Sequence, residues 1–217
     1  MRSVPKVRSS SGGARKPVHG LFCRYLGTHH RNRALTFRNA CNAPRSRVLS
    51  DDELRRVYLA APQDVFGALV RLLILCGQRV KETSLMRPEW LDGRILTIPA
   101  SVTKNKREHH LVIPQSAILL IHQLRPFTAW GKRKRGLDLA SGVENYWYHD
   151  LRRTYAVSLQ RLQVKTEIIE ILLNHTSGFR AGVAGIYQRY DFSKECADAV
   201  DAHEQFLLGL LASREPT

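Results

Sequence analysis

One helical pattern of this 217-residue chain opens with the stretch His149-Asp150-Leu151-Arg152-Arg153-Thr154. Apolar residues then recur at helical spacing as far as Leu162. His149 and Arg152 stand three positions apart, so both point to the same side of the first turn. The amino-terminal end of a helix carries partial positive charge, and a guanidinium adds a full charge. This helix start therefore suits an anion such as a phosphate, with a plain surface pair of His and Arg as the alternative.

Two further cations stand upstream of this helix. Arg79 follows a glycine that ends a helical pattern, in the string Gly77-Gln78-Arg79-Val80-Lys81-Glu82. A planar guanidinium fits two phosphate oxygens, whereas a structural ion pair with Glu82 is the competing interpretation. Lys104 lies at the mouth of a predicted hairpin turn, where it either swings toward a ligand or stays solvated.

Two more candidates lie downstream. His175 ends the helical pattern Ile168-Ile169-Leu172-Leu173, a position where structural histidines are common. Tyr187 and Tyr190 fall in the string Gly185-Ile186-Tyr187-Gln188-Arg189-Tyr190-Asp191 and are equally compatible with core aromatic residues. Each of these residues is a weak signal when it is taken alone.

Taken together, the candidates form an ordered set. Two arginines, a lysine, two histidines and a tyrosine occur in the order Arg79, Lys104, His149, Arg152, His175, Tyr187. In content, order and spacing this set resembles the active site of the tyrosine recombinases, the phage-integrase family. The resemblance spans about residues 48–211, and its matching strings are 77–82, Thr103-Lys104-Asn105, 149–154, Leu172-Leu173-Asn174-His175 and 185–191.

The resemblance implies a nucleophilic tyrosine. Tyr187 would attack a DNA phosphate to give a 3'-phosphotyrosine and a free 5'-hydroxyl, without a metal or a nucleotide cofactor. A phenol with a pKa of about 10 is a poor nucleophile at neutral pH until cationic neighbours favour its anion. Tyr190, three residues further on, is the rival nucleophile, and the family pattern favours Tyr187.

The same resemblance implies a role for each remaining candidate. Arg79 and Arg152 would neutralise the charge of the pentavalent transition state. Lys104 would protonate the 5'-oxygen leaving group. His149 would help to manage the tyrosine proton, and His175 would hydrogen-bond the phosphate.

Hydrophobic periodicity predicts a mainly α chain with a small antiparallel β-sheet, an α+β fold of the integrase catalytic type. Ser50 and Glu53 form a capping box ahead of the first helix. Further helices are expected at 64–76, 80–86, 115–124, 151–162, 167–173 and 194–211. Short β-favouring runs occur at 94–99, 101–103 and 110–113, with a hairpin turn at 104–108, and His109 and His110 are expected on opposite faces. The segment 125–145 is interpreted as a basic loop.

The positive charge of the chain is concentrated at its start. The net charge is +15, and residues 1–50 hold 11 Lys and Arg residues and no acidic residue. We therefore expect a basic, disordered arm over residues 1–47 and a catalytic domain over residues 48–217, with an organellar transit peptide as the alternative for the arm. Double-stranded DNA is the expected partner. The expected DNA-binding residues are Lys106, Lys132, Arg133, Lys134, Arg135 and Arg153.

Other classes of protein are disfavoured by the composition. No apolar run is long enough for a membrane span and no signal peptide opens the chain, so a cytoplasmic, nucleoid-associated protein of bacterial or phage origin is expected. The four cysteines are scattered, and Cys76 and Cys196 fall in apolar helical patterns that favour buried free thiols. A zinc site built from Cys23, His29, His30 and Cys41 lacks paired Cys-x-x-Cys spacing, so no metal is expected.

The sequence also departs from the family pattern. Family members carry a helical core-binding domain ahead of the catalytic one, whereas only the basic arm is expected here. The connection between Leu124 and His149 is short, and Lys81 stands where a glycine is common.

The leading interpretation is site-specific recombination of a mobile element by a homo-tetramer on attachment sites. The alternatives are a truncated DNA-binding remnant and a nick-and-reseal activity of the type IB topoisomerase kind. The last helix has an apolar stripe at Cys196, Val200, His203, Leu207 and Leu210, which either packs on its own domain or mediates assembly.

Overall fold

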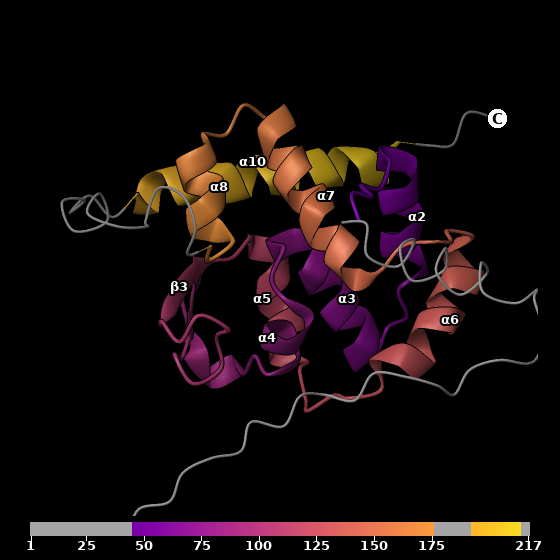
Figure 1. Ribbon diagram of the computed structural model, residues 1–217, viewed down its shortest axis with the longest axis horizontal. Helices are drawn as coiled ribbons and strands as arrows, with labels where there is room; N and C mark the ends of the chain where they lie inside the picture. The colour runs from indigo at the N-terminus through magenta and orange to yellow at the C-terminus, as the bar shows by residue number, and fades with distance from the viewer. Residues whose placement is uncertain (1–44, 176–191, 214–217) are drawn as a thin grey trace, which may run out of the picture. The chain divides into compact units, whose positions relative to one another are not determined.

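The computed structural model describes residues 45–175 and 192–213 (Figure 1). The chain divides into two units, residues 1–44 and 45–217, and all of the described residues belong to the second. Its described part is mainly helical with one three-stranded antiparallel sheet, so the predicted α+β fold class is confirmed. Among the described residues no helix is both long enough and apolar enough to cross a bilayer.

The helices largely follow the predicted pattern, with ends that differ by a few residues. They are α2 (Asp51–Ala60), α3 (Val65–Cys76), α4 (Val80–Ser84), α5 (Gln115–His122), α6 (Trp130–Ser141), α7 (Tyr148–Arg161), α8 (Thr166–Leu172) and α10 (Ser193–Ala212), with a 3-10 turn η1 (Pro88–Trp90).

Local side-chain chemistry fixes the helix ends. The predicted capping box is present, because the Ser50 side chain accepts from the Glu53 amide while the Glu53 carboxylate accepts from the Ser50 amide. Gly77 ends α3 in the left-handed conformation at φ 62°. A Cβ atom on Gly77 would lie 2.4 Å from the Tyr155 ring, so the close approach of α3 and α7 requires glycine here.

The sheet consists of β1 (Leu91–Asp92), β2 (Ile95–Ile98) and β3 (His109–Val112), in that spatial order and all antiparallel. His109 is buried and His110 is exposed, which confirms the predicted alternation. The prediction of a strand at 101–103 was wrong. Val102 and Thr103 both donate main-chain hydrogen bonds to the Pro99 carbonyl and form a turn that begins the β2–β3 connection.

The expectation of a basic loop at 125–145 was also wrong, because most of this segment forms α6. Its glycines and cations give a weak apolar pattern, yet the helix is held by specific contacts. Trp130 Nε1 donates to Ser84 Oγ at 2.6 Å, and the Lys134 ammonium pairs with Asp138 one turn later. The Arg133 guanidinium lies over the Phe66 ring at 4.9 Å. Helix α6 thus depends on aromatic partners from other elements.

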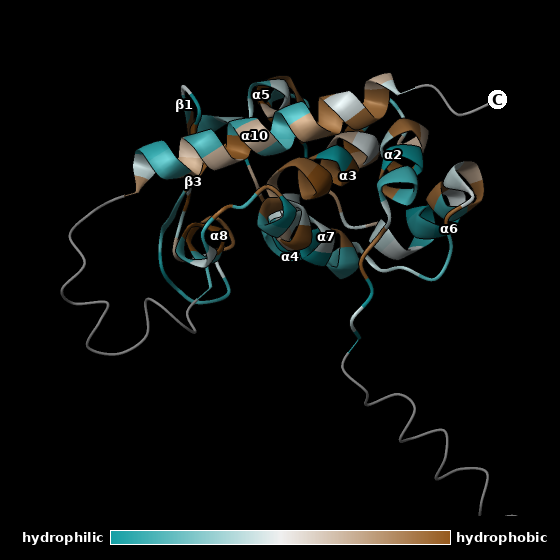
Figure 2. Cartoon of the chain, turned by 90° about the horizontal axis from the view of Figure 1, so that it is seen from above, coloured by the Kyte–Doolittle hydropathy of each residue, from teal (hydrophilic) through white to brown (hydrophobic). Residues whose placement is uncertain are grey.

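The core is centred on α3, which is buried along its length from Phe66 to Cys76. Figure 2 shows α3 as strongly apolar beneath the amphipathic α10. Helix α10 buries Cys196, Val200, His203 and Leu207, so its apolar stripe packs on its own domain. Glu204 of α10 also accepts hydrogen bonds from the first two main-chain amides of α5.

Candidate active site

Arg152 lies in the second turn of α7 and is 4% exposed. Its guanidinium donates to the Gly77 carbonyl at 2.9 Å and to the Leu173 carbonyl at 2.5 Å, which joins the ends of α3 and α8 to α7. Burial and the nearby charge of Arg79 lower the pKa of Arg152 to about 10, so the group remains charged at neutral pH. Within the described residues, Arg152 forms no ion pair with a carboxylate.

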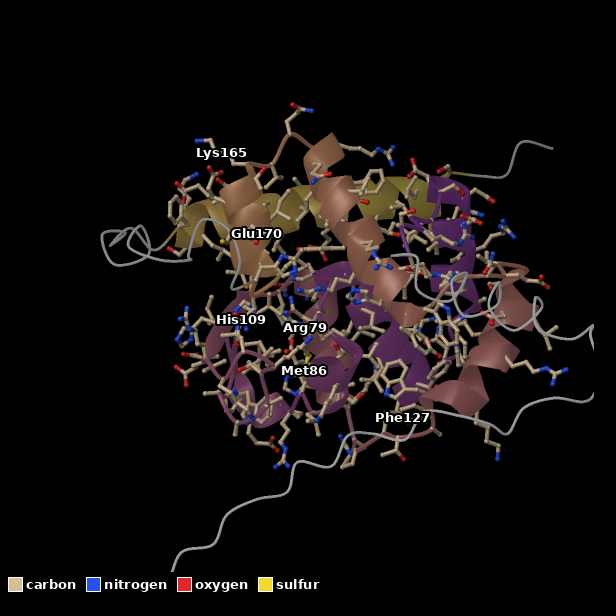
Figure 3. The ribbon with its side chains drawn as sticks, viewed as in Figure 1. Arg79, Met86, His109, Phe127, Lys165 and Glu170 are labelled. Atoms are coloured by element: carbon tan, nitrogen blue, oxygen red, sulfur yellow. The ribbon has the colours of Figure 1, made fainter. Side chains whose placement is uncertain are left out.

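Arg79 occupies the N-cap position of α4 and shares a partner with Lys104. The Arg79 guanidinium donates to Glu82 Oε1 at 3.0 Å, and the main-chain amide of Lys104 donates to the same oxygen at 2.9 Å. Glu82 is 1% exposed, whereas the Lys104 side chain is exposed. The Arg79–Glu82 ion pair therefore exists, and Glu82 also ties the β2–β3 connection to α4 through the Lys104 amide. Figure 3 shows Arg79 near the centre of the view, between Glu170 and Met86.

His149 occupies the first turn of α7 and is exposed. Partial desolvation and the charges of Arg153 and Arg152 lower its pKa below the ordinary value, so the ring is neutral near pH 7. A neutral imidazole in this position can accept a proton.

His175 follows the end of α8. Its Nδ1 lies 2.9 Å from Glu170 Oε1, and its main-chain amide donates to the Glu170 carbonyl at 3.0 Å. A carboxylate partner fixes the orientation of the imidazole and leaves Nε2 available. Glu170 was not among the predicted residues, and its signal, a Glu five positions before a helix-ending His, is too common to single out.

The structure connects four predicted residues through hydrogen bonds and neighbouring chain positions. Arg79 and Lys104 share Glu82. Arg152 binds the carbonyl of Gly77, two positions before Arg79, and that of Leu173, two positions before His175. The predicted nucleophile Tyr187 and its rival Tyr190 lie outside the described residues. Asn105 and Asn174, which sequence reasoning did not single out, form a further link at this site.

The predicted DNA-binding residues differ in how free their charges are. Lys106, Lys132 and Arg135 are exposed. Arg133 pairs with Asp64 at 2.6 Å, and the Lys134 ammonium lies 3.6 Å from the centre of the Tyr146 ring. Arg153 pairs with Asp150 at 2.6 Å and keeps a third of its side chain exposed.

The described residues hold no cluster of His, Cys, Asp or Glu that could bind a metal ion. The four residues of the zinc alternative, Cys23, His29, His30 and Cys41, lie outside the described residues. Cys76 is a free, buried thiol, and Cys196 is buried as well. Burial raises the pKa of the Cys76 thiol to about 12, so it is unreactive at neutral pH.

Comparison with known proteins finds integrases and a recombinase among the proteins that are similar to this chain. No protein-family model matches the chain. A prophage integrase of Escherichia coli K12, IntZ, is 28% identical over 159 aligned residues, which cover 61% of this chain and 39% of that relative. This chain therefore matches well under half of the relative's length.

Solved structures show the same fold. The integrase from mycobacterium phage Brujita aligns with a TM-score of 0.60 and 20% identity, over 79% of this chain and 66% of that one. The catalytic domain of bacteriophage HP1 integrase aligns with a TM-score of 0.52 and 17% identity, over 61% of this chain and 83% of that one. The XerA recombinase aligns with a TM-score of 0.51 and 20% identity, over 79% of this chain and 68% of that one. The solved structures show that this chain shares the fold of these integrase and recombinase domains, and together with the prophage integrase they support the resemblance found in the sequence.

Proposed function

We propose that this chain catalyses site-specific DNA recombination by cleaving and rejoining strands through a 3'-phosphotyrosine. The observation that carries the proposal is Arg152, a buried guanidinium held by two carbonyl dipoles beside the charge of Arg79. A buried cation without a paired carboxylate is costly to keep in a fold. The cost is offset when an anionic ligand occupies the site, and a DNA phosphate is the anion that the recombinase fold and the basic chain favour.

In the proposed reaction, Tyr187 forms a bond from its phenolic oxygen to phosphorus while the bond from phosphorus to the 5'-oxygen breaks. Neutral His149 takes the phenolic proton. The Lys104 ammonium gives a proton to the departing 5'-oxygen. Arg79 and Arg152 stabilise the charge on the non-bridging oxygens, and His175 donates a hydrogen bond to one of them.

The second strand transfer is the same step in reverse. A 5'-hydroxyl attacks the phosphotyrosine, the phenol leaves, and the phosphodiester is restored without ATP because its bond energy was kept in the covalent intermediate. We propose double-stranded attachment sites as the substrate and a homo-tetramer on DNA as the active assembly. Recombination requires two duplexes to be cut at matching positions, which a four-subunit assembly provides.

The test is a trap for the covalent adduct. Wild-type, Tyr187→Phe and Tyr190→Phe proteins are incubated with nicked duplexes drawn from the DNA that flanks the gene, and the products are separated on a denaturing gel. The nick lets the 5'-hydroxyl fragment diffuse away, so the covalent product accumulates.

We expect a slow protein–DNA band from wild type and from Tyr190→Phe and none from Tyr187→Phe. A band from Tyr187→Phe would overturn the assignment of the nucleophile. If no variant gives a band while wild type still shifts the same duplex on a native gel, the chain binds DNA without cleaving it.

A further inference from the structure

The last carbonyls of α8 gather three segments of the site. A helix leaves its final carbonyls without intrahelical partners. Here three consecutive carbonyls accept hydrogen bonds from side chains of other elements: Leu172 from Gln78 at 2.9 Å, Leu173 from Arg152, and Asn174 from Asn105 at 3.2 Å.

Each donor is a site residue or the chain neighbour of one. Gln78 precedes Arg79, Asn105 follows Lys104, and Arg152 is itself a proposed site residue. His175 follows the third carbonyl directly. The end of α8 therefore serves as a common anchor for segments that lie far apart in the sequence.

From this arrangement we propose that Asn105 and Asn174 form an amide clasp that positions Lys104 for proton transfer to the leaving group. Both are positioning residues, and the inference rests on the function proposed above. Asn105 Nδ2 donates to Asn174 Oδ1 at 2.7 Å as well as to the Asn174 carbonyl. Asn105 Oδ1 accepts from the Arg107 amide at 3.3 Å, which shapes the loop around it.

The backbone at Asn174 is suited to this task. Asn174 is 8% exposed and has a φ of 50°, a left-handed conformation that Asn tolerates better than most residues. The conformation ends α8 and turns the Asn174 side chain toward the β2–β3 connection. Asn105 and Asn174 are 69 positions apart, so their contact belongs to the tertiary fold alone.

The clasp is the second of two anchors for the Lys104 segment. The first is the main-chain hydrogen bond from Lys104 to Glu82. Lys104 is itself exposed, with a long side chain that many rotamers accommodate. Holding its backbone on both sides limits the volume that the ammonium samples, which is what a general acid requires.

The test separates proton donation from other losses by changing the leaving group. A nicked duplex with sulfur in place of the bridging 5'-oxygen releases a thiolate, which needs no general acid because a thiol is far more acidic than an alcohol. Cleavage rates are measured on the oxygen and the sulfur duplex for wild type, Lys104→Ala, Asn105→Ala and Asn174→Gly. Glycine is chosen at 174 because it accepts the left-handed backbone.

We expect Asn105→Ala to cleave the oxygen duplex about 100-fold more slowly than wild type, and Asn174→Gly to be slower in the same direction. On the sulfur duplex both variants should come within about 3-fold of wild type, as should Lys104→Ala, because general acid catalysis is no longer required. Ser101→Ala, an exposed change in the same connection, is the matched control and should equal wild type on both duplexes.

Three results would overturn the inference. If Asn105→Ala cleaves the oxygen duplex as fast as wild type, the clasp does not position Lys104. An equal loss on both duplexes shows a structural role unrelated to the proton. Hydrogen exchange tests the clasp independently of catalysis. The main-chain amides of residues 103–107 should exchange faster in Asn105→Ala than in wild type. Unchanged exchange rates would show that the clasp does not hold this segment. If wild type cleaves neither duplex, the proposed function fails, and the exchange result alone then decides whether the clasp exists.

Discussion

At the scale of single residues, Asp150 organises the start of α7. It is fully buried, and its carboxylate accepts from the Trp147 amide at 2.8 Å, Arg45 at 2.8 Å and Arg153 at 2.6 Å. Burial alone would raise the pKa of Asp150, but these donors outweigh it and hold the pKa below its ordinary value. Because Asp150 stands between His149 and Arg152, its contacts fix the turn that presents both.

Replacing Asp150 by Asn should lower the free energy of unfolding by about 2 kcal/mol at pH 7, because hydrogen bonds from cations to a buried carboxylate are lost while both arginines can reach water. Asp150 stabilises the fold when it is ionised, so its contribution is present above pH 4 and fades as the pH falls below that value. Urea unfolding of wild type and Asp150→Asn at pH 7 and pH 3 measures this. If the two proteins differ in free energy of unfolding by as much at pH 3 as at pH 7, the stabilisation does not come from ionised Asp150.

At the scale of elements, the contact between α10 and α7 contains a buried histidine. His203 of α10 is 1% exposed, and its ring lies 4.6 Å from the Tyr155 ring of α7 in an edge-to-face arrangement. Neither ring nitrogen has a hydrogen-bond partner among the described residues. Burial therefore lowers the pKa of His203 to about 4, and the folded protein holds this ring neutral at pH 7.

This contact predicts loss of stability in mild acid. An unfolded histidine has a pKa of about 6.5, so between pH 6.5 and pH 4 the unfolded chain binds the proton and the folded chain does not. His203 should therefore cost about 2 kcal/mol of stability on going from pH 7.5 to pH 5. The check is thermal or urea unfolding of wild type and His203→Leu at both pH values. The stability lost between pH 7.5 and pH 5 should be smaller in the variant by that amount. An equal loss of stability in both proteins would show that His203 is not the cause of the acid sensitivity.

At the scale of the whole molecule, the charge is unequally available to a polyanion. On α6, Lys132 and Arg135 are exposed, whereas Lys134 pairs with Asp138 and contacts the Tyr146 ring. A cation that is already paired releases fewer DNA counterions on binding than a free one. The basic run therefore divides into exposed cations that are available to a polyanion and cations that hold α6 in place.

Removing the two exposed cations of α6 should weaken DNA binding in a salt-dependent way. For Lys132→Ala/Arg135→Ala, the slope of log affinity against log salt should fall by about 2, since each phosphate contact contributes about one unit. Fluorescence anisotropy with a labelled duplex across a potassium chloride series provides the slope. Lys165→Ala, an exposed cation beside α8, is the control for loss of charge alone. A slope equal to that of wild type would place the DNA elsewhere on the surface.

Local signals determined much of the fold. The capping box at Ser50, the glycine stop at Gly77 and the apolar periodicity of 64–76 each depend on residues within a few positions, so they can be read from sequence. The family resemblance supplied the ordered set of candidate residues for the same reason, because its motifs are short strings. The basic run at 132–135 misled the prediction, since the aromatic rings that hold α6 come from α3 and from the residues before α7.

The sequence by itself determined which residue types are present for the proposed phosphate chemistry and, except for α6, which segments are helical. Only the tertiary structure decided that Arg152 is buried against the end of α8 and that Asn105 meets Asn174. The reason is physical: those contacts join groups 21 and 69 positions apart, through carbonyls that every residue possesses. A main-chain carbonyl has no signature in sequence, and it becomes specific only when the fold leaves it unpaired at a helix end.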